Sequence, residues 1–386
     1  MTIQEHHITS DKLTLKVLDR NSEMNLSESL DEQDVSFYDF HFAEYTNNDL
    51  KKNIGKKEKW HIKYASVLPY NHPEGVITIG EHNTPLVNSK KHPNGYYKEE
   101  TRNPSGCFKD RECAVLFPYL KEQGYKKLSV ASSGNAALSA ALYASLYEFE
   151  LTCYVPEKTT QSKLNLIQAF GGNIEFAGKN YEEAHRMLAK KELKKGEINI
   201  TAGVHPLKDQ GNKLIAYEIY EEIGTPHAVL VPSGNGCLLF AIFQGFMELQ
   251  TAGIIKKTPQ FYAIQIENAS PLELGIKKKT IIEKNTNPPE SKAEGIIAEE
   301  SFSMPKAIHA IHKSNGGIIT INEKELEEGM KTALREEGLI PEWTAAATFA
   351  AMKKFYSNKK NAEKIAVGIN TGSGNKQIKE IVNTIV

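Results

Sequence analysis

The sequence predicts an α/β protein that contains two open, twisted sheets whose strands are mostly parallel. Three segments carry this prediction, because each joins a short β-branched run through a small-residue or polar loop to an amphipathic helix. They read "KKLSVASSGNAALSAALYASLYE" from Lys126, "LTCYVPEKTTQSKLNLIQAFGG" from Leu151 and "HAVLVPSGNGCLLFAIFQGFMELQ" from His227. Strands that alternate with helices of this length are typical of parallel sheets covered on both faces.

Length and composition support a globular protein and exclude several other classes. The chain has 386 residues, enough for two domains, and a net charge of −1, which does not favour nucleic acid or an anionic membrane as a partner. It has no apolar run of the roughly 20 residues that a membrane span needs, and its polar N-terminus does not resemble a secretory signal. The four cysteines form no CxxC pair, so we expect a cytoplasmic protein without a structural metal.

The remaining elements follow in chain order. Residues 1–59 are polar and charged and read as an N-terminal extension without an assigned structure. The folded part begins near Trp60, and a helix begins near Phe108, after the turn "NPSG". Residues 277–300 are charged and contain two adjacent prolines, which predicts a surface excursion or lid. Residues 316–355 predict a strand and two helices, and "KIAVGI" predicts a last buried strand that opens into "NTGSGNK".

Lys109 occupies an unusual place in the stretch "NPSGCFKDRE". It stands in the first turn of the predicted helix, where the positive end of the helix dipole disfavours a cation. One interpretation is a surface lysine whose charge is offset by Asp110. The other is that Lys109 is a neutral amine or imine that is held at the helix start for chemistry.

Three loops at predicted strand ends could bind an anion, because free backbone N–H groups and helix dipoles converge there. They are "SSGN" at 132–135, "SGNGC" at 233–237 and "TGSGN" at 371–375. None matches a dinucleotide or nucleoside triphosphate fingerprint, and "PSGNG" lacks the spacing of a hydrolase elbow. Each alone is compatible with a simple turn, but together with Lys109 they suit a phosphorylated aldehyde cofactor.

From Trp60 to Lys376 the chain resembles the fold-type II pyridoxal-phosphate enzymes, and among them the threonine synthases. "NPSGCFKDRE" is similar to NPTGSFKDRG, "ASSGNAALSAALYAS" to ASTGNxAAS, and "VPSGNGCL" to VPxGNGGN. "WHIKYASVLP", "GEHNTPLV", "DQGNKLIAYEI", "EEGLIPEWTAAATFA" and "NTGSGNK" also resemble family segments, in the family's order.

The resemblance implies a role for each matching residue. Lys109 would carry pyridoxal 5′-phosphate and then move substrate protons, and Thr371 would meet the pyridine nitrogen with a hydroxyl. A hydroxyl there favours elimination and replacement chemistry. The other implied cofactor contacts are Phe108 against the ring, Asn135 at the 3′-oxygen, and Gly234, Asn235, Gly236, Cys237 and Leu238 around the phosphate. The implied substrate contacts are Ser132, Ser133 and Gly134 at the carboxylate and Lys208 near a substrate phosphate.

The chain departs from the family pattern mainly where the substrate is chosen. Cys107 replaces a serine and Ala136 a frequent threonine, while Ala202 and Gly203 replace the Asn-Ser pair. Lys208 replaces an arginine and so lacks the two-pronged geometry that suits phosphate. Trp343, Ser373, Cys237 and Leu238 also differ from the pattern; the phosphate loop stays usable if Cys237 avoids positive φ.

We therefore expect a smaller domain at 108–205, a larger domain at 60–107 and 206–386, and the cofactor in the cleft between them. The expected reaction is elimination or replacement at the β or γ carbon of an amino acid, closest to threonine synthase. The alternatives are a β-replacement synthase that uses a serine ester or phosphoserine, and a serine/threonine dehydratase. A binding protein without turnover is a further alternative. By the resemblance, the enzyme would be a homodimer.

Overall fold

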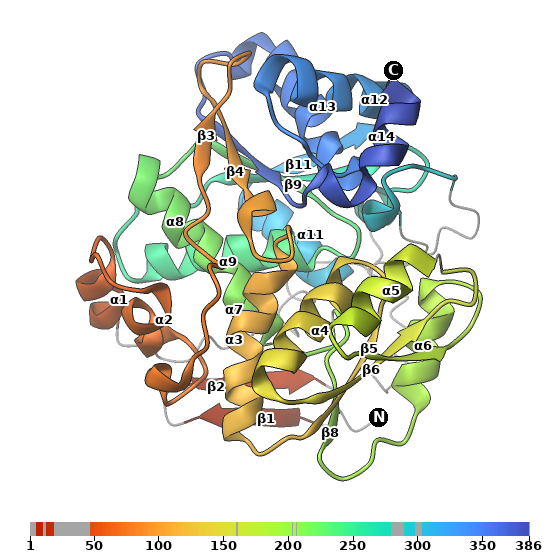
Figure 1. Cartoon of the computed structure of the whole chain (residues 1–386). Coiled ribbons are helices and arrows are strands. Elements are labelled where there is room, and N and C mark those ends of the chain that lie inside the picture. The colour runs from red at the N-terminus through yellow and green to blue at the C-terminus, as the bar shows by residue number, and fades with distance from the viewer. Residues whose placement is uncertain are drawn as a thin grey trace.

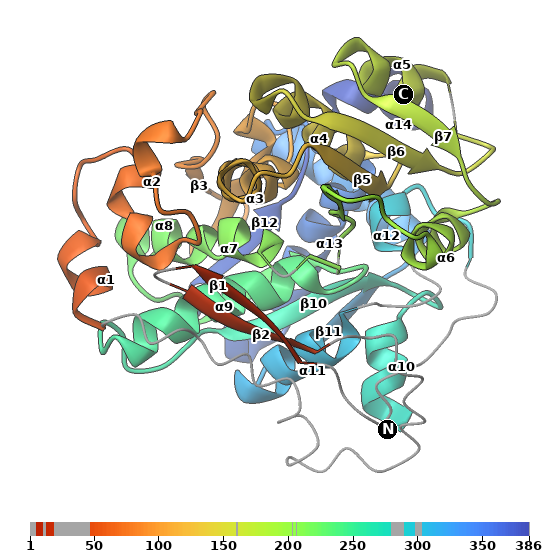
Figure 2. The same cartoon turned by 90° about the horizontal axis from the view of Figure 1, so that it is seen from below.

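The computed structural model describes residues 5–10, 13–18, 47–159, 161–202, 204–205, 207–278, 289–297 and 303–385. It contains two larger sheets with helices packed around them, and a separate two-stranded sheet (Figures 1 and 2). Within these residues, no helix is long and apolar enough to cross a lipid bilayer.

The larger sheet has six strands in the order β11-β10-β9-β12-β4-β3. Five of them run parallel, and the edge strand β3 pairs with β4 in the antiparallel sense. The bounds are Leu86–Asn88 for β3, Gly95–Glu99 for β4, Ala228–Pro232 for β9, Gln260–Ile266 for β10, Gly317–Ile321 for β11 and Ala366–Asn370 for β12. Strands β9 and β12 are buried along their whole length, which explains their continuous apolar sequences.

Helices cover both faces of this sheet. One face carries α12 (Glu323–Thr332) and α13 (Trp343–Ser357), and the other carries α9 (Cys237–Thr251), α8 (Leu214–Ile223) and α11 (Met304–Lys313). Asn322 caps α12 in a reciprocal capping box with Glu325, which fixes the start of that helix. We call this sheet and these helices the large lobe.

The smaller sheet has four parallel strands in the order β7-β6-β5-β8. Their bounds are Lys127–Ala131 for β5, Glu150–Val155 for β6, Asn173–Phe176 for β7 and Glu197–Asn199 for β8. Helices α4 (Asn135–Tyr147), α5 (Gln161–Ala169) and α6 (Tyr181–Lys190) pack around this sheet. We call this sheet and these helices the small lobe; all of it lies inside the predicted domain 108–205.

Helix α3 (Lys109–Glu122) lies between the lobes, packed against α4 and against α7 (Lys208–Asn212). Gly211 of α7 makes the close approach possible, because a Cβ there would lie 1.9 Å from the Arg111 carbonyl oxygen. Arg111 is fully buried and binds Glu100 at 2.5 Å and Glu218 at 2.6 Å, so this arginine joins α3 to the large lobe.

The predicted strand–helix units are confirmed as β5–α4, β6–α5 and β9–α9, and the predicted strand and two helices after residue 316 as β11, α12 and α13. Strands β3, β4, β7, β8 and β10 were not predicted, because short or irregular apolar runs give a weak pattern. In the predicted extension 1–59, β1 (Glu5–Ser10) pairs with β2 (Leu13–Leu18), and α1 spans Asn47–Asn53. Residues 279–288 and 298–302 of the predicted lid and its end lie outside the described residues.

Candidate active site

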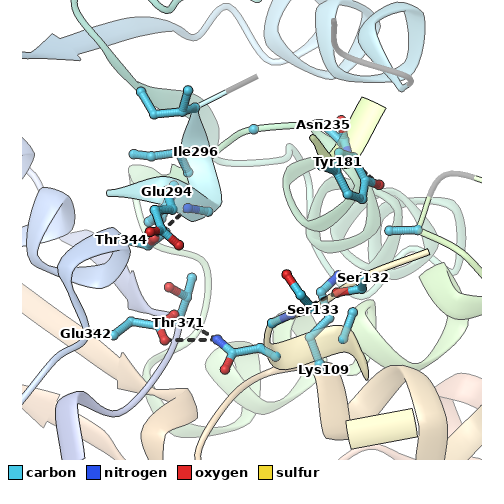
Figure 3. A pocket seen from close by; sticks show the side chains of 18 of the residues that line it. Lys109, Ser132, Ser133, Tyr181, Asn235, Glu294, Ile296, Glu342, Thr344 and Thr371 are labelled. Atoms are coloured by element: carbon cyan, nitrogen blue, oxygen red, sulfur yellow. Dashed lines mark hydrogen bonds between the residues drawn. The ribbon is translucent and has the colours of Figure 1, made fainter. Parts of the chain in front are cut away.

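A cavity of about 630 Å³ lies between the two lobes, at the carboxyl ends of several parallel strands. Figure 3 shows two groups of side chains that face each other across it. Glu294, Ile296, Thr344, Glu342 and Thr371 lie along one side, and Tyr181, Asn235, Ser132, Ser133 and Lys109 along the other. Ligands of open α/β sheets bind at strand ends of this kind, which makes the cavity the candidate active site.

Lys109 is the first residue of α3 and lines the cavity, with its Nζ 4.5 Å from the centre of the Phe108 ring. The segment before it pairs with the segment after β12 like two strands of a sheet. The Phe108 N–H donates to the Thr371 carbonyl at 3.1 Å, and the Ser373 N–H donates to the Gly106 carbonyl at 2.8 Å. This backbone ladder holds Lys109 and Thr371 in one rigid unit.

Lys109 is ion-paired rather than free. Its Nζ donates to Glu112 Oε1 at 2.6 Å, one helical turn further along α3. Burial would lower the pKa of Lys109, but the attraction of Glu112 outweighs it and raises this pKa. Burial would likewise raise the pKa of Glu112, but Lys109 and Lys208 lower it to about 2.

The loop before α4 brings small polar groups to the cavity. Ser132, Ser133 and Gly134 line it, and the Gly134 N–H donates to the Ser132 hydroxyl at 3.2 Å. Asn135 begins α4 and donates to both oxygens of Glu342 from the large lobe, at 3.0 and 2.9 Å. Burial raises the pKa of the Glu342 carboxyl, although Lys376 and Asn135 oppose the shift. The Asn135–Glu342 contact therefore links the two lobes across the cavity.

A glycine-containing loop enters α9 on the large-lobe side of the cavity. Gly236 caps this helix with a φ of +83°, a conformation that favours glycine, and Cys237 is already the first helical residue. A Cβ on Gly234 would lie 2.8 Å from the Gly295 carbonyl oxygen, and one on Gly236 only 2.5 Å from the Ala307 Cβ. Cys237 is thus outside the positive-φ region, as a usable phosphate loop requires.

Thr371 provides the most informative polar atom in the cavity. The residue is 2% exposed, and its Oγ1 has no hydrogen-bond partner among the described residues. A buried hydroxyl without a partner costs free energy unless a ligand satisfies it. The Thr371 side chain is therefore placed to bind a polar ligand atom.

Similarity to known proteins identifies the family of the chain. A family model described as "Pyridoxal-phosphate dependent enzyme" matches residues 77–372, most of the chain. The chain belongs to this family. The residues that line the cavity fit pyridoxal phosphate: an amine at Lys109, an unpartnered hydroxyl at Thr371, and backbone N–H groups at the start of α9 for the phosphate.

Among curated proteins of this pyridoxal-phosphate family, the chain is similar to threonine synthases. It is 30% identical to the threonine synthase of Methanocaldococcus jannaschii over 82% of this chain and 80% of that protein. It is also 30% identical to that of a Bacillus species, over 81% of this chain and 89% of the relative.

Solved structures support the fold. A fungal L-serine ammonia-lyase from Rhizomucor miehei matches with a TM-score of 0.68 at 18% identity, over 78% of this chain and 98% of that one. A pyridoxal 5′-phosphate-dependent aspartate racemase matches with a TM-score of 0.67 at 21% identity, over 86% of this chain and 97% of that one. The predicted fold class is thereby confirmed.

Most predicted site residues lie together at the cavity. The lining includes Phe108, Lys109, Ser132, Ser133, Gly134, Asn135, Gly234, Asn235, Gly236, Cys237, Leu238 and Thr371. Ala136 and Ala202, two of the departures, also line it, whereas Gly203 lies outside the described residues.

Lys208 is the exception among the predicted substrate contacts. It is 4% exposed, is not among the residues that line the cavity, donates to the Ile200 carbonyl at 2.9 Å and forms an ion pair with Glu112 at 3.0 Å. Two of the departures, Cys107 and Trp343, are also fully buried and are absent from the lining. Neither side chain forms part of the cavity surface.

Sequence reasoning missed several residues of the site. Glu112 follows Lys109 by three positions on one helix, so this spacing alone could have placed the two side chains on the same face. Glu342 meets Asn135 across 207 positions, and the Lys163–Glu294 ion pair of 2.8 Å spans 131; both join the two lobes at the cavity. No local pattern indicates contacts of such separation.

Proposed function

We propose that the chain catalyses elimination or replacement at the β or γ carbon of an amino acid, closest to the threonine synthase reaction. In that reaction O-phosphohomoserine is converted to threonine and phosphate. The threonine synthase relatives support this assignment. The observation that carries it is the buried Thr371 hydroxyl, which has no hydrogen-bond partner in the described part of the chain and lies in the cavity that Lys109 lines.

Each residue of the cavity would have its own role in the reaction, set by its position. Lys109 would hold the cofactor covalently and, once substrate replaces it, take up and return protons at the substrate's α and β carbons. Thr371 Oγ1 would hydrogen-bond the ring nitrogen, and the start of α9 would hold the phosphate. Pyridoxal phosphate, when bound, withdraws electrons and so acidifies the substrate's α C–H.

The start of α4 suits the substrate carboxylate. Ser132, Ser133 and Gly134 lie directly before this helix of 13 residues, where N–H groups and the helix dipole favour an anion. The Asn135–Glu342 pair orients the Asn135 amide toward the large-lobe side. A carboxylate held at this loop would be anchored to the small lobe while the reacting carbons face Lys109.

A second candidate is a β-replacement synthase that acts on an acylated serine. The placement of Lys208 favours it, because this lysine binds Glu112 instead of facing the cavity. Ala202 also contributes no polar group to the lining. A cavity without these two polar contacts is less suited to a phosphorylated side chain than to an uncharged ester.

Lys109→Ala tests the cofactor assignment. The variant should lose the visible absorbance of lysine-bound pyridoxal phosphate, whereas Lys121→Ala, at the exposed end of the same helix, should keep it. A colourless wild-type protein that takes up no pyridoxal phosphate would refute the proposal.

An activity assay with a panel of candidate substrates distinguishes the alternatives. The panel contains O-phosphohomoserine, O-phosphoserine, O-acetylserine, serine and threonine. Release of phosphate, acetate or keto acid identifies the chemistry. Phosphate release from O-phosphohomoserine with formation of threonine supports the first assignment. Acetate release from O-acetylserine in the presence of an added nucleophile such as sulfide, with formation of the β-substituted amino acid, supports the second. Keto acid release from serine or threonine alone indicates a dehydratase, and no turnover of any member would contradict both candidates.

We also propose a homodimer in a reducing cytoplasm. Cys107, Cys113, Cys153 and Cys237 are all free thiols, which suits such a compartment. Light scattering of the purified holoenzyme measures the mass directly. A value near the 43.1 kDa of a single chain would contradict the dimer.

A further inference from the structure

A buried carboxylate stands directly beside the lysine of the cavity. Glu112 is 2% exposed, and its Oε1 accepts from Lys109 Nζ at 2.6 Å. The two residues are separated by one turn of α3, so the helix itself fixes their distance. The matching position of the family motif is a glycine, which has no side chain to fill this role.

The other side of Glu112 is occupied by a second cation. Lys208 Nζ lies 3.0 Å from Oε2, and Asn212 donates to Oε1 at 3.0 Å. Both come from α7, which approaches α3 closely because Gly211 lacks a Cβ. One carboxylate therefore lies between two ammonium groups in a site that is screened from water.

The second cation, Lys208, compensates the charge of Glu112 when Lys109 is covalently attached to the cofactor. Attachment replaces the ammonium of Lys109 and would leave a single buried carboxylate without a cation at its Oε1. An unpaired buried carboxylate is costly. Lys208 remains paired with Glu112 in both situations, so Glu112 can stay ionised whether Lys109 is attached or free.

We propose that Glu112 is a positioning residue, which holds the unattached Lys109 as an ammonium in a fixed orientation, and that Lys208 keeps Glu112 ionised. The proposal rests on the proposed function, since it takes Lys109 as the lysine that carries the cofactor. Only the neutral amine attacks an aldehyde carbon, so Glu112 also sets the pH at which the apoprotein takes up pyridoxal phosphate.

Other titratable groups lie around the pair, among them the buried Cys113, which adjoins Glu112, and the buried His205, which adjoins Lys208. Cys107 before α3 and Cys237 of α9 face Lys109, and burial raises the pKa of both thiols, so they stay neutral. Asp209 of α7 pairs with Lys306 of α11 at 3.1 Å, and the half-buried Tyr181 of α6 lies near Glu112. Glu112 is thus the carboxylate in direct contact with Lys109.

The experiment measures the titration of Lys109 in the apoprotein by trace acetylation at a series of pH values, with mass spectrometry of the Lys109 peptide. Glu112→Gln should shift the midpoint down by about one to three pH units, because the neighbouring anion is lost. Lys208→Met should shift it up, because Glu112 then has one cation instead of two. Glu328→Gln, which breaks a surface pair with Lys353, is the control and should leave the profile unchanged.

Opposite shifts support the proposal, since a general loosening of the fold would move both profiles in the same direction. Unchanged profiles, or shifts of the same sign, overturn it. If Glu112→Gln does not fold, an unchanged profile in Lys208→Met alone overturns it. At pH 7 the apo Glu112→Gln variant should also take up pyridoxal phosphate faster than wild type, as followed by visible absorbance. Failure of the proposed function appears separately, as retained absorbance in Lys109→Ala.

Discussion

Replacing Arg111 with methionine should destabilise the protein strongly. The Arg111 guanidinium is fully buried and binds Glu100 at 2.5 and 2.9 Å and Glu218 at 2.6 and 2.7 Å. Arg111 also donates to a third partner, the Thr84 hydroxyl, at 2.9 Å. Methionine fills much of the same volume but leaves the two buried carboxylates without this cation.

The size of the destabilisation depends on the partners that Glu100 and Glu218 keep after Arg111 is replaced. Removing one member of a buried ion pair typically costs about 3–5 kcal/mol, because the remaining charge is uncompensated. Glu218 keeps Lys98 at 2.9 Å, which moderates the loss, whereas the partners that Glu100 keeps among the described residues are the hydrogen-bond donors Thr84 and Asn103. We therefore expect a loss of about 3–5 kcal/mol in the free energy of unfolding.

Tryptophan fluorescence in urea measures this loss, because Trp60 and Trp343 are both buried. With a urea dependence of about 3 kcal/mol/M, the unfolding midpoint should fall by about 1 to 1.7 M. Arg102→Met is the matched control, since Arg102 is exposed, and it should change the free energy by less than about 0.5 kcal/mol. Equal midpoints for Arg111→Met and wild type, with a raised KM, would show instead that Arg111 serves the substrate.

Three further predictions concern the cavity. Thr371→Val should weaken pyridoxal phosphate binding about tenfold without destabilising the apoprotein, because it removes a hydroxyl that lacks a partner; an absorbance titration that gives equal affinities would contradict this. Gly236→Ala should weaken binding more than that, because it forces a side chain to a φ of +83° against Ala307, whereas Gly171→Ala has the same φ, meets open space and should leave binding unchanged. Glu112→Gln should lower the apoprotein's free energy of unfolding by about 3 kcal/mol at pH 7, since the pKa falls from 4.5 to about 2 on folding. The lowered pKa of Glu112 stabilises the folded protein above pH 4.5, and this stabilisation is lost as the pH falls to about 2. The urea midpoints of variant and wild type should therefore converge at pH 2, and a difference that persists there would contradict the reasoning.

The elements that position the site could be predicted because each is encoded locally. The β-branched run at Lys127–Ala131, the loop "SSGN" and the apolar helix from Asn135 lie next to each other in the sequence. The start of α3 was likewise visible from the turn "NPSG". The positions of Lys109 and Asn135 at the cavity follow from these local signals and from the common geometry of strand ends.

The partners of these residues could not be predicted in the same way. Whether Glu342 reaches Asn135 depends on how the lobes pack, which no local pattern specifies. Lys208 illustrates the same limit, since its sequence position suggested a substrate contact. The close packing of α7 on α3 brings it instead to Glu112, whose charge attracts it.

The backbone pairing between the segments at Gly106–Phe108 and Thr371–Ser373 fixes a distance within the site. It sets the distance between the side chains of Lys109 and Thr371, which would bind opposite ends of one small molecule. Deleting one residue from either segment would shift the pairing and turn the following side chains to the other face. A changed register here would therefore separate Lys109 from Thr371, the two residues proposed to bind the cofactor.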